Sequence, residues 1–511
     1  MRTEGRKASG SSGAASCSPR ASGHHSRLFH GRGRAVMSTG PLWQKSATEL
    51  SALIRKGEVS AVDAVQSSVD RMQAVNPGLN AVVTDLSASA LERAKTLDAW
   101  KGPKGPLHGV PITIKINIDQ KGEASSNGVV AFKDLIAPGD APLVKNLLDA
   151  GAVVIGRTNV PEFSRRCDTD NPLFGRTWNP WGKHVSPGGS SGGAGAAVAA
   201  GIGALGHGND IGGSLRFPAA GNGIVTVKPG VQRVPVYNPS QTAERGILAQ
   251  QMSAQGLLAR SARDLHLSMP PMIAADPRDP FHVPLPWRGP ALDGPIKVGF
   301  SLEAPDLPLH PLVEKALLAA RAALTDAGYV VEEMAAPSLR EIAFEGRQAL
   351  MTESYHLMAE DIEKYGSPAI VSVFEQNYRR TPTVEMKPML QMLARRTFYA
   401  RQWSELMAEY PLFLSPFLPV PFYAPGRDAE GAEGLRESIG QGHWSTLGNY
   451  LGLPAGNVPA GLGEFPEGPK PIGVQILGQR WREDLVVDAM IAIEDRLGTL
   501  SRQLWARMAG G

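Results

Sequence analysis

Two glycine-flanked serines, Ser190 and Ser214, bracket the stretch of this sequence that is richest in small residues, Gly188 to Pro218. A serine hydroxyl can act as a nucleophile, and neighbouring glycines allow the backbone to turn its N–H groups toward one point. Such N–H groups make the oxyanion hole that acyl transfer requires. Glycine and serine clusters are more often flexible loops. Here apolar residues interrupt the cluster, so we expect it to be the catalytic centre.

The segment between the two serines has to position them. Residues 194–204 are almost all alanine and glycine, which predicts a helix packed closely against larger elements. Upstream, Val110, Ile112, Ile114 and Ile116 alternate with other residues, as in a strand with one apolar face. Lys115 then points to the opposite face. An inward-facing lysine is avoided unless it is paired or functional, whereas a surface lysine is common. The residues alone leave both interpretations open.

Three ordered motifs in this chain resemble those of the amidase signature family: GVPITIK, GGSSGG and DIGGSLRFPA, at residues 109–115, 188–193 and 210–219. The resemblance spans about residues 46–497 and is weakest in the middle third. Residues 156–163, 256–265, 449–456 and 471–476 also resemble segments of the family. The family resemblance implies an α/β fold, a single large domain with a mixed central β-sheet covered by helices on both faces.

The resemblance also implies a reaction, the hydrolysis of carboxylic acid amides to the acid and ammonia or an amine. In the family's Ser-Ser-Lys relay, Ser214 is the nucleophile that forms the acyl-enzyme, Ser190 is the bridging serine and Lys115 is the base. The oxyanion hole would consist of the backbone N–H groups of Ile211, Gly212, Gly213 and Ser214. Lys115 must be neutral to accept a proton, so burial has to lower its pKa from about 10.4 toward about 7–8.

Polar residues beside the nucleophile have other expected roles. Asp210 and Arg216 carry opposite charges on either side of the Ser214 loop, and we expect an ion pair that stiffens the turn. Asn209 stands where many family members carry threonine, and it is a candidate substrate contact. Asp119 lies four residues after Lys115, so a nearby carboxylate could oppose the required pKa shift. We expect neither a metal nor another cofactor.

Two glycine motifs suggest other folds. Residues 188–192 fit the G-x-S-x-G elbow of α/β-hydrolases, which would make Ser190 the nucleophile. That elbow follows a hydrophobic strand, whereas residues 181–187 do not resemble one. Residues 201–206 match the dinucleotide pattern G-x-G-x-x-G, but no predicted strand leads into them. We therefore interpret the second match as chance.

Other side chains could contribute to catalysis. Cys167 could be the thiol of a Glu-Lys-Cys amidase, but no base is apparent beside it, and we expect a plain thiol near the surface. His108 and His207 adjoin the motifs and could assist proton transfer. Structural histidines with satisfied hydrogen bonds are the more common case.

Three alternative functions are considered, two of them within the same family and one on the same fold without catalysis. The A-type subunit of a tRNA-dependent amidotransferase usually has glutamine where this chain has Phe217. A fatty acid amide hydrolase would need a membrane helix or cap, which the sequence does not suggest. A non-catalytic binding protein on the same fold would have no need of Lys115, Ser190 and Ser214 together.

The overall composition of the chain indicates which partners and which cellular compartment to expect. The 511 residues are 42% hydrophobic and 20% charged, with a net charge of +3, so nothing asks for a nucleic-acid partner. Two scattered cysteines, Cys17 and Cys167, suit a reducing compartment, and no run of apolar residues is long enough to span a membrane. We expect a cytoplasmic enzyme that binds a small-molecule amide, with no nucleic acid and no membrane partner. A homodimer is left open.

The chain is predicted to fold as one domain after an extension. Residues 1–40 are rich in Arg, Ser and Gly and are expected to be disordered or a non-native N-terminal extension, with the amidase signature domain at 41–505. Ser46 and Glu49 predict a capping box, and Asn76-Pro77 predicts the end of the second helix. Residues 339–407 are helical by pattern and rich in Met and aromatic residues. We expect them to form the variable wall of the substrate pocket, although such residues are more often plain core.

Overall fold

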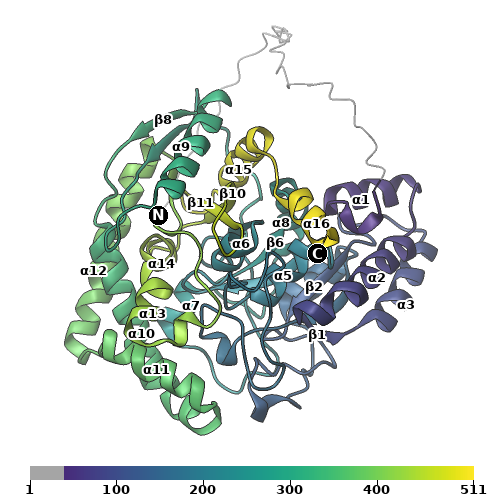
Figure 1. Ribbon diagram of the computed structural model, residues 1–511, viewed down its shortest axis with the longest axis horizontal. Coiled ribbons are helices and arrows are strands. Elements are labelled where there is room, and N and C mark those ends of the chain that lie inside the picture. The colour runs from purple at the N-terminus through teal and green to yellow at the C-terminus, as the bar shows by residue number, and fades with distance from the viewer. Residues whose placement is uncertain (1–39, 511) are drawn as a thin grey trace, which may run out of the picture. The chain divides into compact units, whose positions relative to one another are not determined.

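A mixed sheet of 11 strands runs through residues 40–510, the part of the chain that the computed structural model describes (Figure 1). The strands are β1 (Val82–Asp85), β2 (Pro111–Lys115), β3 (Val153–Thr158), β4 (Leu205–Asp210), β5 (Val225–Lys228), β6 (Ala254–Ala259), β7 (Lys297–Phe300), β8 (Val330–Glu333), β9 (Leu412–Pro416), β10 (Ala455–Gly463) and β11 (Lys470–Gly478). Their order is β1-β3-β2-β4-β6-β5-β10-β11-β9-β7-β8. Strand β2 pairs in parallel with β3 and β4, whereas β4, β6 and β5 pair antiparallel. The predicted α/β class with a mixed sheet is confirmed.

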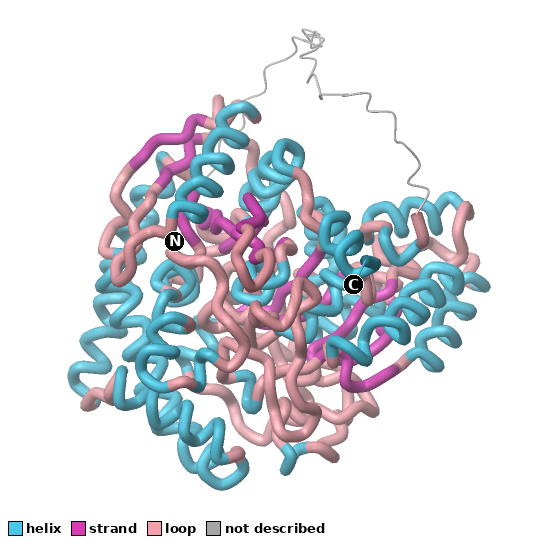
Figure 2. Tube along the Cα trace, in the orientation of Figure 1, coloured by secondary structure: helices cyan, strands magenta, loops and turns pink. Residues whose placement is uncertain are grey.

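Helices surround this sheet (Figure 2). The α-helices are α1 (Ala47–Lys56), α2 (Ala61–Leu79), α3 (Ser87–Ala99), α4 (Pro142–Asp149), α5 (Gly192–Ala200), α6 (Arg216–Asn222), α7 (Ile247–Met252), α8 (Ala262–Met272), α9 (Pro311–Asp326), α10 (Leu339–Tyr365), α11 (Pro368–Arg380), α12 (Met386–Glu409), α13 (Gly431–Glu437), α14 (His443–Tyr450), α15 (Glu483–Leu497) and α16 (Ser501–Gly510). Short 3₁₀ turns are η1 (Leu42–Gln44), η2 (Val130–Phe132), η3 (Glu162–Ser164), η4 (Arg427–Ala429) and η5 (Ile439–Gln441). None of the described helices is long and apolar enough to cross a membrane.

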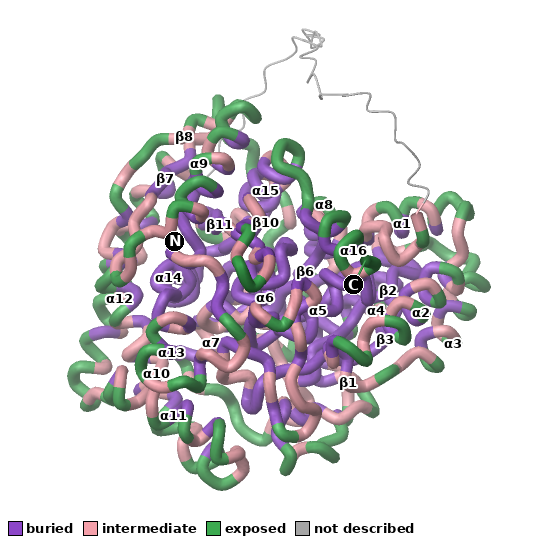
Figure 3. The backbone as a smooth tube through the Cα atoms, viewed as in Figure 1, coloured by how far each residue is buried: buried purple, intermediate pink, exposed green. Residues whose placement is uncertain are grey.

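The two faces of the sheet bury different helices, because side chains alternate along each strand. On one face, Ile112 and Val154 belong to a core shared with α1, α4, α8, α9 and α15. On the other face, Val153 and Ile155 pack with α2, α3 and α5. Figure 3 shows the central strands as buried and the outer turns of the helices as exposed. The serine-bearing segment therefore lies on the α5 face.

Helix ends agree with the sequence in one case and differ in another. The Ser46 hydroxyl accepts the Glu49 N–H while the Glu49 carboxylate accepts the Ser46 N–H, so the predicted capping box is confirmed. The predicted end of α2 at Asn76-Pro77 is wrong, because α2 continues to Leu79. Pro77 removes one hydrogen bond in the last turn, and Asn80, with φ 51°, is the residue that ends the helix.

Small residues bring α5 against the sheet. The predicted helix at 194–204 is α5, which ends earlier, at Gly201 with φ 92°. All of α5 is buried, and a Cβ on Gly193 would lie 2.5 Å from the backbone nitrogen of Asn159. Only glycine fits at that approach. Trp505 on α16 donates its indole N–H to the Ala199 carbonyl, and α16 continues beyond the predicted boundary at residue 505.

Two further predictions concern the N-terminal extension and the helical region at residues 339–407. The expected extension, residues 1–40, lies outside the described residues except for Gly40. Residues 339–407 contain α10, α11 and most of α12, in agreement with their helical pattern.

Candidate active site

Lys115 is the last residue of β2 and lies on the same face of the sheet as α5. Its neighbours Ile112 and Ile114 point into the core on the other face, as the alternation predicted. Lys115 has no exposed surface. The strand therefore delivers an amine to the start of α5, where Ser190 and Ser191 lie.

Three polar side chains surround the Lys115 amine. Its Nζ lies 2.8 Å from Ser190 Oγ, 3.0 Å from Ser191 Oγ and 2.7 Å from Asn209 Oδ1. Burial lowers the pKa of Lys115 well below its usual value, and the charge of Asp210 opposes this only in part. The site thus favours the neutral amine that a general base requires.

Asp119 does not oppose this shift directly. Its carboxylate accepts hydrogen bonds from the hydroxyls of Ser125, at 2.6 Å, and Ser240, at 2.9 Å. These partners hold it among the loops beyond β2. Asp210, rather than Asp119, is the carboxylate whose charge acts on Lys115.

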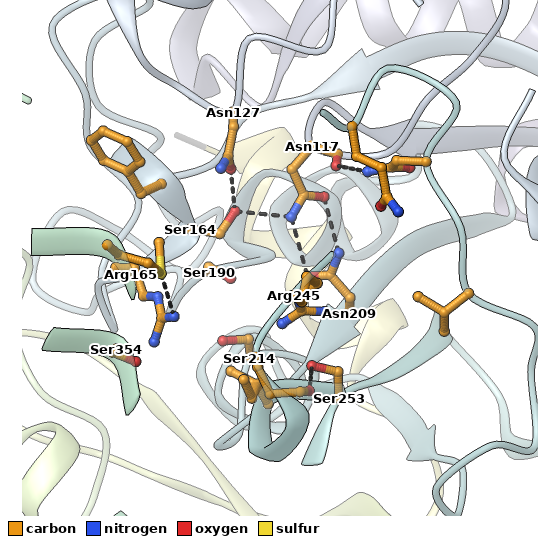
Figure 4. A pocket seen from close by; sticks show the side chains of 18 of the residues that line it. Asn117, Asn127, Ser164, Arg165, Ser190, Asn209, Ser214, Arg245, Ser253 and Ser354 are labelled. Atoms are coloured by element: carbon orange, nitrogen blue, oxygen red, sulfur yellow. Dashed lines mark hydrogen bonds between the residues drawn. The ribbon is translucent and has the colours of Figure 1, made fainter. Parts of the chain in front are cut away.

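Ser190 and Ser214 line one cavity of about 460 Å³ (Figure 4). Ser190 lies just before α5, and its hydroxyl is held by Lys115. Ser214 lies in the turn between β4 and α6, and its hydroxyl makes no hydrogen bond to any other residue in the described range 40–510. One serine is therefore coupled to the lysine, while the other faces the cavity with its hydroxyl free.

The turn that carries Ser214 is organised by Asp210. The Asp210 carboxylate accepts two bonds from Arg216, both at 3.0 Å, and both side chains are fully buried, so the predicted ion pair is present. Burial raises the pKa of Asp210, but Arg216 outweighs burial and holds it well below its usual range. The Gly213 N–H also donates to Asp210, at 2.7 Å. Among the predicted oxyanion donors, Gly213 is thus already engaged, which leaves Ile211, Gly212 and Ser214.

Asn209 contacts Lys115 as well as the cavity. It lines the cavity, as a substrate contact should, but its carbonyl oxygen faces Lys115. Its Nδ2 donates to Asn117 Oδ1 at 3.0 Å, and Asn117 Nδ2 donates to Ser164 Oγ at 3.0 Å. Asn117 was not among the residues predicted from the sequence. It lies in the turn that follows β2, where strand alternation no longer predicts the direction of a side chain.

The cavity wall comes only partly from the region predicted to form it. Of residues 339–407, the turns of α10 that contain Glu353, Leu357 and Met358 contribute lining residues. The other walls come from residues 163–165 and from the loop at 236–246. Neither segment was predicted to line the pocket, because loops have no periodic pattern that shows which side chains face a cavity.

Other candidates for chemistry are excluded by their surroundings. Cys167 is 6% exposed and burial raises the pKa of its thiol, so the predicted near-surface thiol is wrong. Burial lowers the pKa of His207 to about 3, and its Nε2 pairs with Gln255 Oε1. His108 pairs with the Leu97 carbonyl, so each histidine has one structural hydrogen bond, while His207 Nδ1 is buried without a partner among the described residues.

The two glycine motifs also lack their required context. Gly201, which opens the G-x-G-x-x-G match, ends α5, so a helix rather than a strand leads into it. No described strand leads into residues 188–192 either, and the Ser190 hydroxyl there is bonded to Lys115. The elbow interpretation therefore lacks its strand.

The site holds a buried lysine bonded to Ser190 and Ser191, and a free Ser214 hydroxyl in the cavity that Ser190 also lines. A serine hydrolase with an amine base requires groups of these kinds. A family model described as Amidase matches residues 63–487. The chain belongs to the amidase signature family and is an enzyme that hydrolyses amides. The predicted family and enzyme class are confirmed.

Individual relatives agree with this assignment. The chain is 46% identical to an indoleacetamide hydrolase of Bradyrhizobium diazoefficiens, over 92% of this chain and 90% of the relative. It is 29% identical to a 6-aminohexanoate-cyclic-dimer hydrolase of Paenarthrobacter ureafaciens, over 91% of this chain and 97% of the relative. Among solved structures, a bacterial aryl acylamidase of the family is similar with a TM-score of 0.78 and 27% identity, covering 92% of this chain and 100% of that one.

Proposed function

We propose that this amidase works through an acyl-enzyme on Ser214, with Ser190 as the bridging serine and Lys115 as the base. The observation that carries the proposal is the 2.8 Å contact between Lys115 Nζ and Ser190 Oγ, at a fully buried amine. The free Ser214 hydroxyl in the same cavity supports the division of roles.

In the first half-reaction, Ser214 Oγ attacks the amide carbon while its proton passes to Ser190 Oγ. The Ser190 proton passes to the neutral amine of Lys115. Negative charge develops on the substrate oxygen, where backbone N–H groups of Ile211, Gly212 and Ser214 stabilise it. When the tetrahedral intermediate collapses, Ser190 gives a proton to the leaving nitrogen and takes one back from Lys115. Ammonia or an amine departs, and the acyl group remains on Ser214.

In the second half-reaction, water replaces the departed amine. Ser190, restored as an acceptor by Lys115, removes the proton of that water as it attacks the acyl carbon. The same N–H groups stabilise the second oxyanion. Breakage of the ester bond returns the proton to Ser214 and releases the carboxylic acid, so the relay ends in its starting state.

The substrate class that we propose is a primary amide with an aryl or other bulky apolar acyl group. The 46% identity to an indoleacetamide hydrolase supports this choice, and so do Phe163, Leu357 and Met358 in the cavity wall. Indole-3-acetamide is therefore the first substrate to test. The balanced charge and the two cysteines of the sequence support a cytoplasmic location without a nucleic-acid partner.

The amidotransferase A-type subunit is the less well supported alternative. Its motif carries glutamine where Phe217 stands, and Phe217 is buried with its ring 4.9 Å from that of Phe417. An aromatic core contact of this kind has no polar role at position 217. The free serine and the buried base also speak against a non-catalytic binding protein.

The test measures ammonia release from indole-3-acetamide and a panel of aliphatic and aryl primary amides. Wild type is compared with Ser214→Ala, Ser190→Ala and Lys115→Ala, and intact mass is recorded after rapid quenching. The proposal expects no turnover by Ser214→Ala, turnover lowered by at least about a hundredfold in the other two, and an acyl adduct on Ser214. An adduct on Ser190 would overturn the assignment of the nucleophile. Failure of wild type to cleave any of these amides would overturn the substrate class.

A further inference from the structure

Two arginines, Arg165 and Arg245, lie in the wall of the cavity that holds the two serines (Figure 4). Arg165 follows η3, and Arg245 lies in the loop that precedes α7. Arg165 is half-buried and Arg245 is exposed, and both border the cavity. A bound substrate can therefore reach them.

Neither guanidinium group has an ionic partner within the described residues. Several other arginines in residues 40–510 form ion pairs with carboxylates, but Arg165 and Arg245 do not. The Arg245 side chain makes no hydrogen bond there, and Arg165 Nη2 contacts only the Met358 sulfur, at 2.9 Å. Arginine side chains stay charged at neutral pH, and the charge of Arg165 acts on Arg245. Two like charges near each other repel, and a bound anion would offset that repulsion.

The Glu353 carboxylate, which lines the same wall, is already engaged by backbone donors. Glu353 acts on both arginines by charge, but its two oxygens accept the N–H groups of Leu248 and Ala249 at the start of α7, at 2.8 and 2.7 Å. Glu244 also lines the wall and accepts a bond from Gln241, with no ion pair to either arginine. The arginines' hydrogen-bonding groups thus remain available to a ligand.

One more donor lies close to Arg165. The Tyr378 hydroxyl is buried without a hydrogen-bond partner among the described residues, and it is near enough to Arg165 for their charges to interact. Tyr378 does not itself line the cavity, so the guanidinium groups of Arg165 and Arg245 are the donors that a ligand there can reach. Planar, fork-like guanidinium groups suit the two oxygens of a carboxylate.

We infer that Arg165 and Arg245 form a carboxylate-binding subsite, and that the enzyme accepts amides whose acyl group ends in a carboxylate, such as the monoamides of dicarboxylic acids. This inference rests on the proposed function, since it assigns the far end of the substrate that Ser214 attacks. It extends the substrate class from neutral aryl amides to anionic ones. The released acid would then be a dicarboxylate.

The test measures binding and turnover separately. Calorimetry with Ser214→Ala protein compares the monoamides of succinate, glutarate and adipate with their neutral diamides, which match them in length. At least one monoamide should bind about tenfold to a hundredfold more tightly than its diamide, as expected for a hydrogen-bonded charge. Arg245→Gln or Arg165→Gln, added to Ser214→Ala, should reduce that ratio by about tenfold or more.

Matched variants make the outcome specific. Arg321→Gln removes a positive charge from α9, outside the residues that line the cavity, and should leave the ratio unchanged. Arg245→Lys keeps the charge but loses the fork, so it should retain part of the preference. If no monoamide is preferred, or if the preference survives both glutamine variants, the subsite is wrong.

The same protein separates this failure from failure of the proposed function. Binding to Ser214→Ala does not depend on catalysis, so a preference for monoamides would stand even if wild type cleaved none of them. Cleavage of indole-3-acetamide by wild type without any monoamide preference would support the relay and overturn the arginine subsite. Thermal melts of each variant verify that the fold is intact.

Discussion

Asn209 Oδ1 lies 2.7 Å from Lys115 Nζ, while the other end of the same amide donates to Asn117 at 3.0 Å. The Asn117 contact fixes which end of the amide faces the lysine. A neutral oxygen can hold the amine in place without the charge that would raise its pKa. In the proposed relay, Asn209 is therefore a positioning residue, because it holds Lys115 without adding a charge.

Asn209→Asp should shift the pH dependence of the enzyme. A carboxylate at this distance favours the protonated lysine, so the pKa of Lys115 rises and the amine is neutral only at higher pH. The rise of kcat/KM with pH should move upward by about one unit or more, with about a tenfold loss at neutral pH. The measurement is kcat/KM for indole-3-acetamide across the pH range.

Asn209→Leu is the matched control for charge. It removes the hydrogen bond without adding a carboxylate, so it should lower kcat while leaving the pH midpoint near or below that of wild type. An Asn209→Asp enzyme with the wild-type midpoint would show that position 209 does not act on the pKa of Lys115.

The sequence predicted those features of this site that depend on local patterns of residues. Alternation placed Lys115 opposite Ile114, and the glycine-rich turn placed Ser214 in a sharp reversal, because both effects depend on a few consecutive residues. The arginine subsite was not predictable in this way. Arg165 and Arg245 come from loops far apart in sequence and meet only through tertiary packing.

The sequence also could not predict the direction in which an individual backbone N–H group points. Gly213 was expected to point its N–H into the oxyanion hole, but that N–H donates to Asp210. The direction of the Gly213 N–H depends on the position of the buried Asp210–Arg216 pair. Asn449 on α14 contacts both of these side chains. Long-range polar contacts of this kind decide orientation after local sequence has decided the turn.

Asp210→Asn should destabilise the fold strongly. It leaves the fully buried Arg216 without its counter-charge, and such a loss costs about 3–5 kcal/mol. Urea unfolding measures the change. Asp495→Asn, which breaks an exposed pair with Arg263, should cost at most about 1 kcal/mol. Equal losses in the two variants would contradict a special role for the buried pair.

Lys228 should make stability depend on pH. Burial, with the charge of Arg216, lowers the pKa of Lys228 to about 7, against 10.5 for an ordinary lysine. Between these values the unfolded chain holds more protons than the folded one, so the free energy of unfolding rises with pH. Each such group contributes a slope of up to about 1.4 kcal/mol per pH unit.

Lys228→Met should remove this contribution. Urea unfolding from pH 7 to 9 should then show a shallower slope than wild type, while the remaining slope from Lys115 persists. Lys297→Met is the control, because Glu409 raises the pKa of Lys297 and keeps it protonated across that range. Identical slopes in wild type and Lys228→Met would show that Lys228 titrates normally.

Gly193→Ala should disturb both the fold and the active site. The added Cβ would lie 2.5 and 2.6 Å from the backbone of Asn159 and 2.7 Å from the Ala81 carbonyl, and backbone cannot move aside as a flexible side chain can. Helix α5 must shift, at a cost of about 1–3 kcal/mol. Because Ser190 lies just before α5, the shift also strains its contact with Lys115, and kcat should fall.

Gly78→Ala tests the same change where there is room. Gly78 lies in the last turn of α2 and no atom lies within 4 Å of its added Cβ, so alanine should stabilise by about 0.5–1 kcal/mol through helix propensity. Thermal unfolding and kcat/KM are measured for both variants. Opposite signs in stability, with activity lost only in Gly193→Ala, would tie the glycine at the start of α5 to the position of Ser190. A fully active, stable Gly193→Ala would mean that α5 can move without moving the serine.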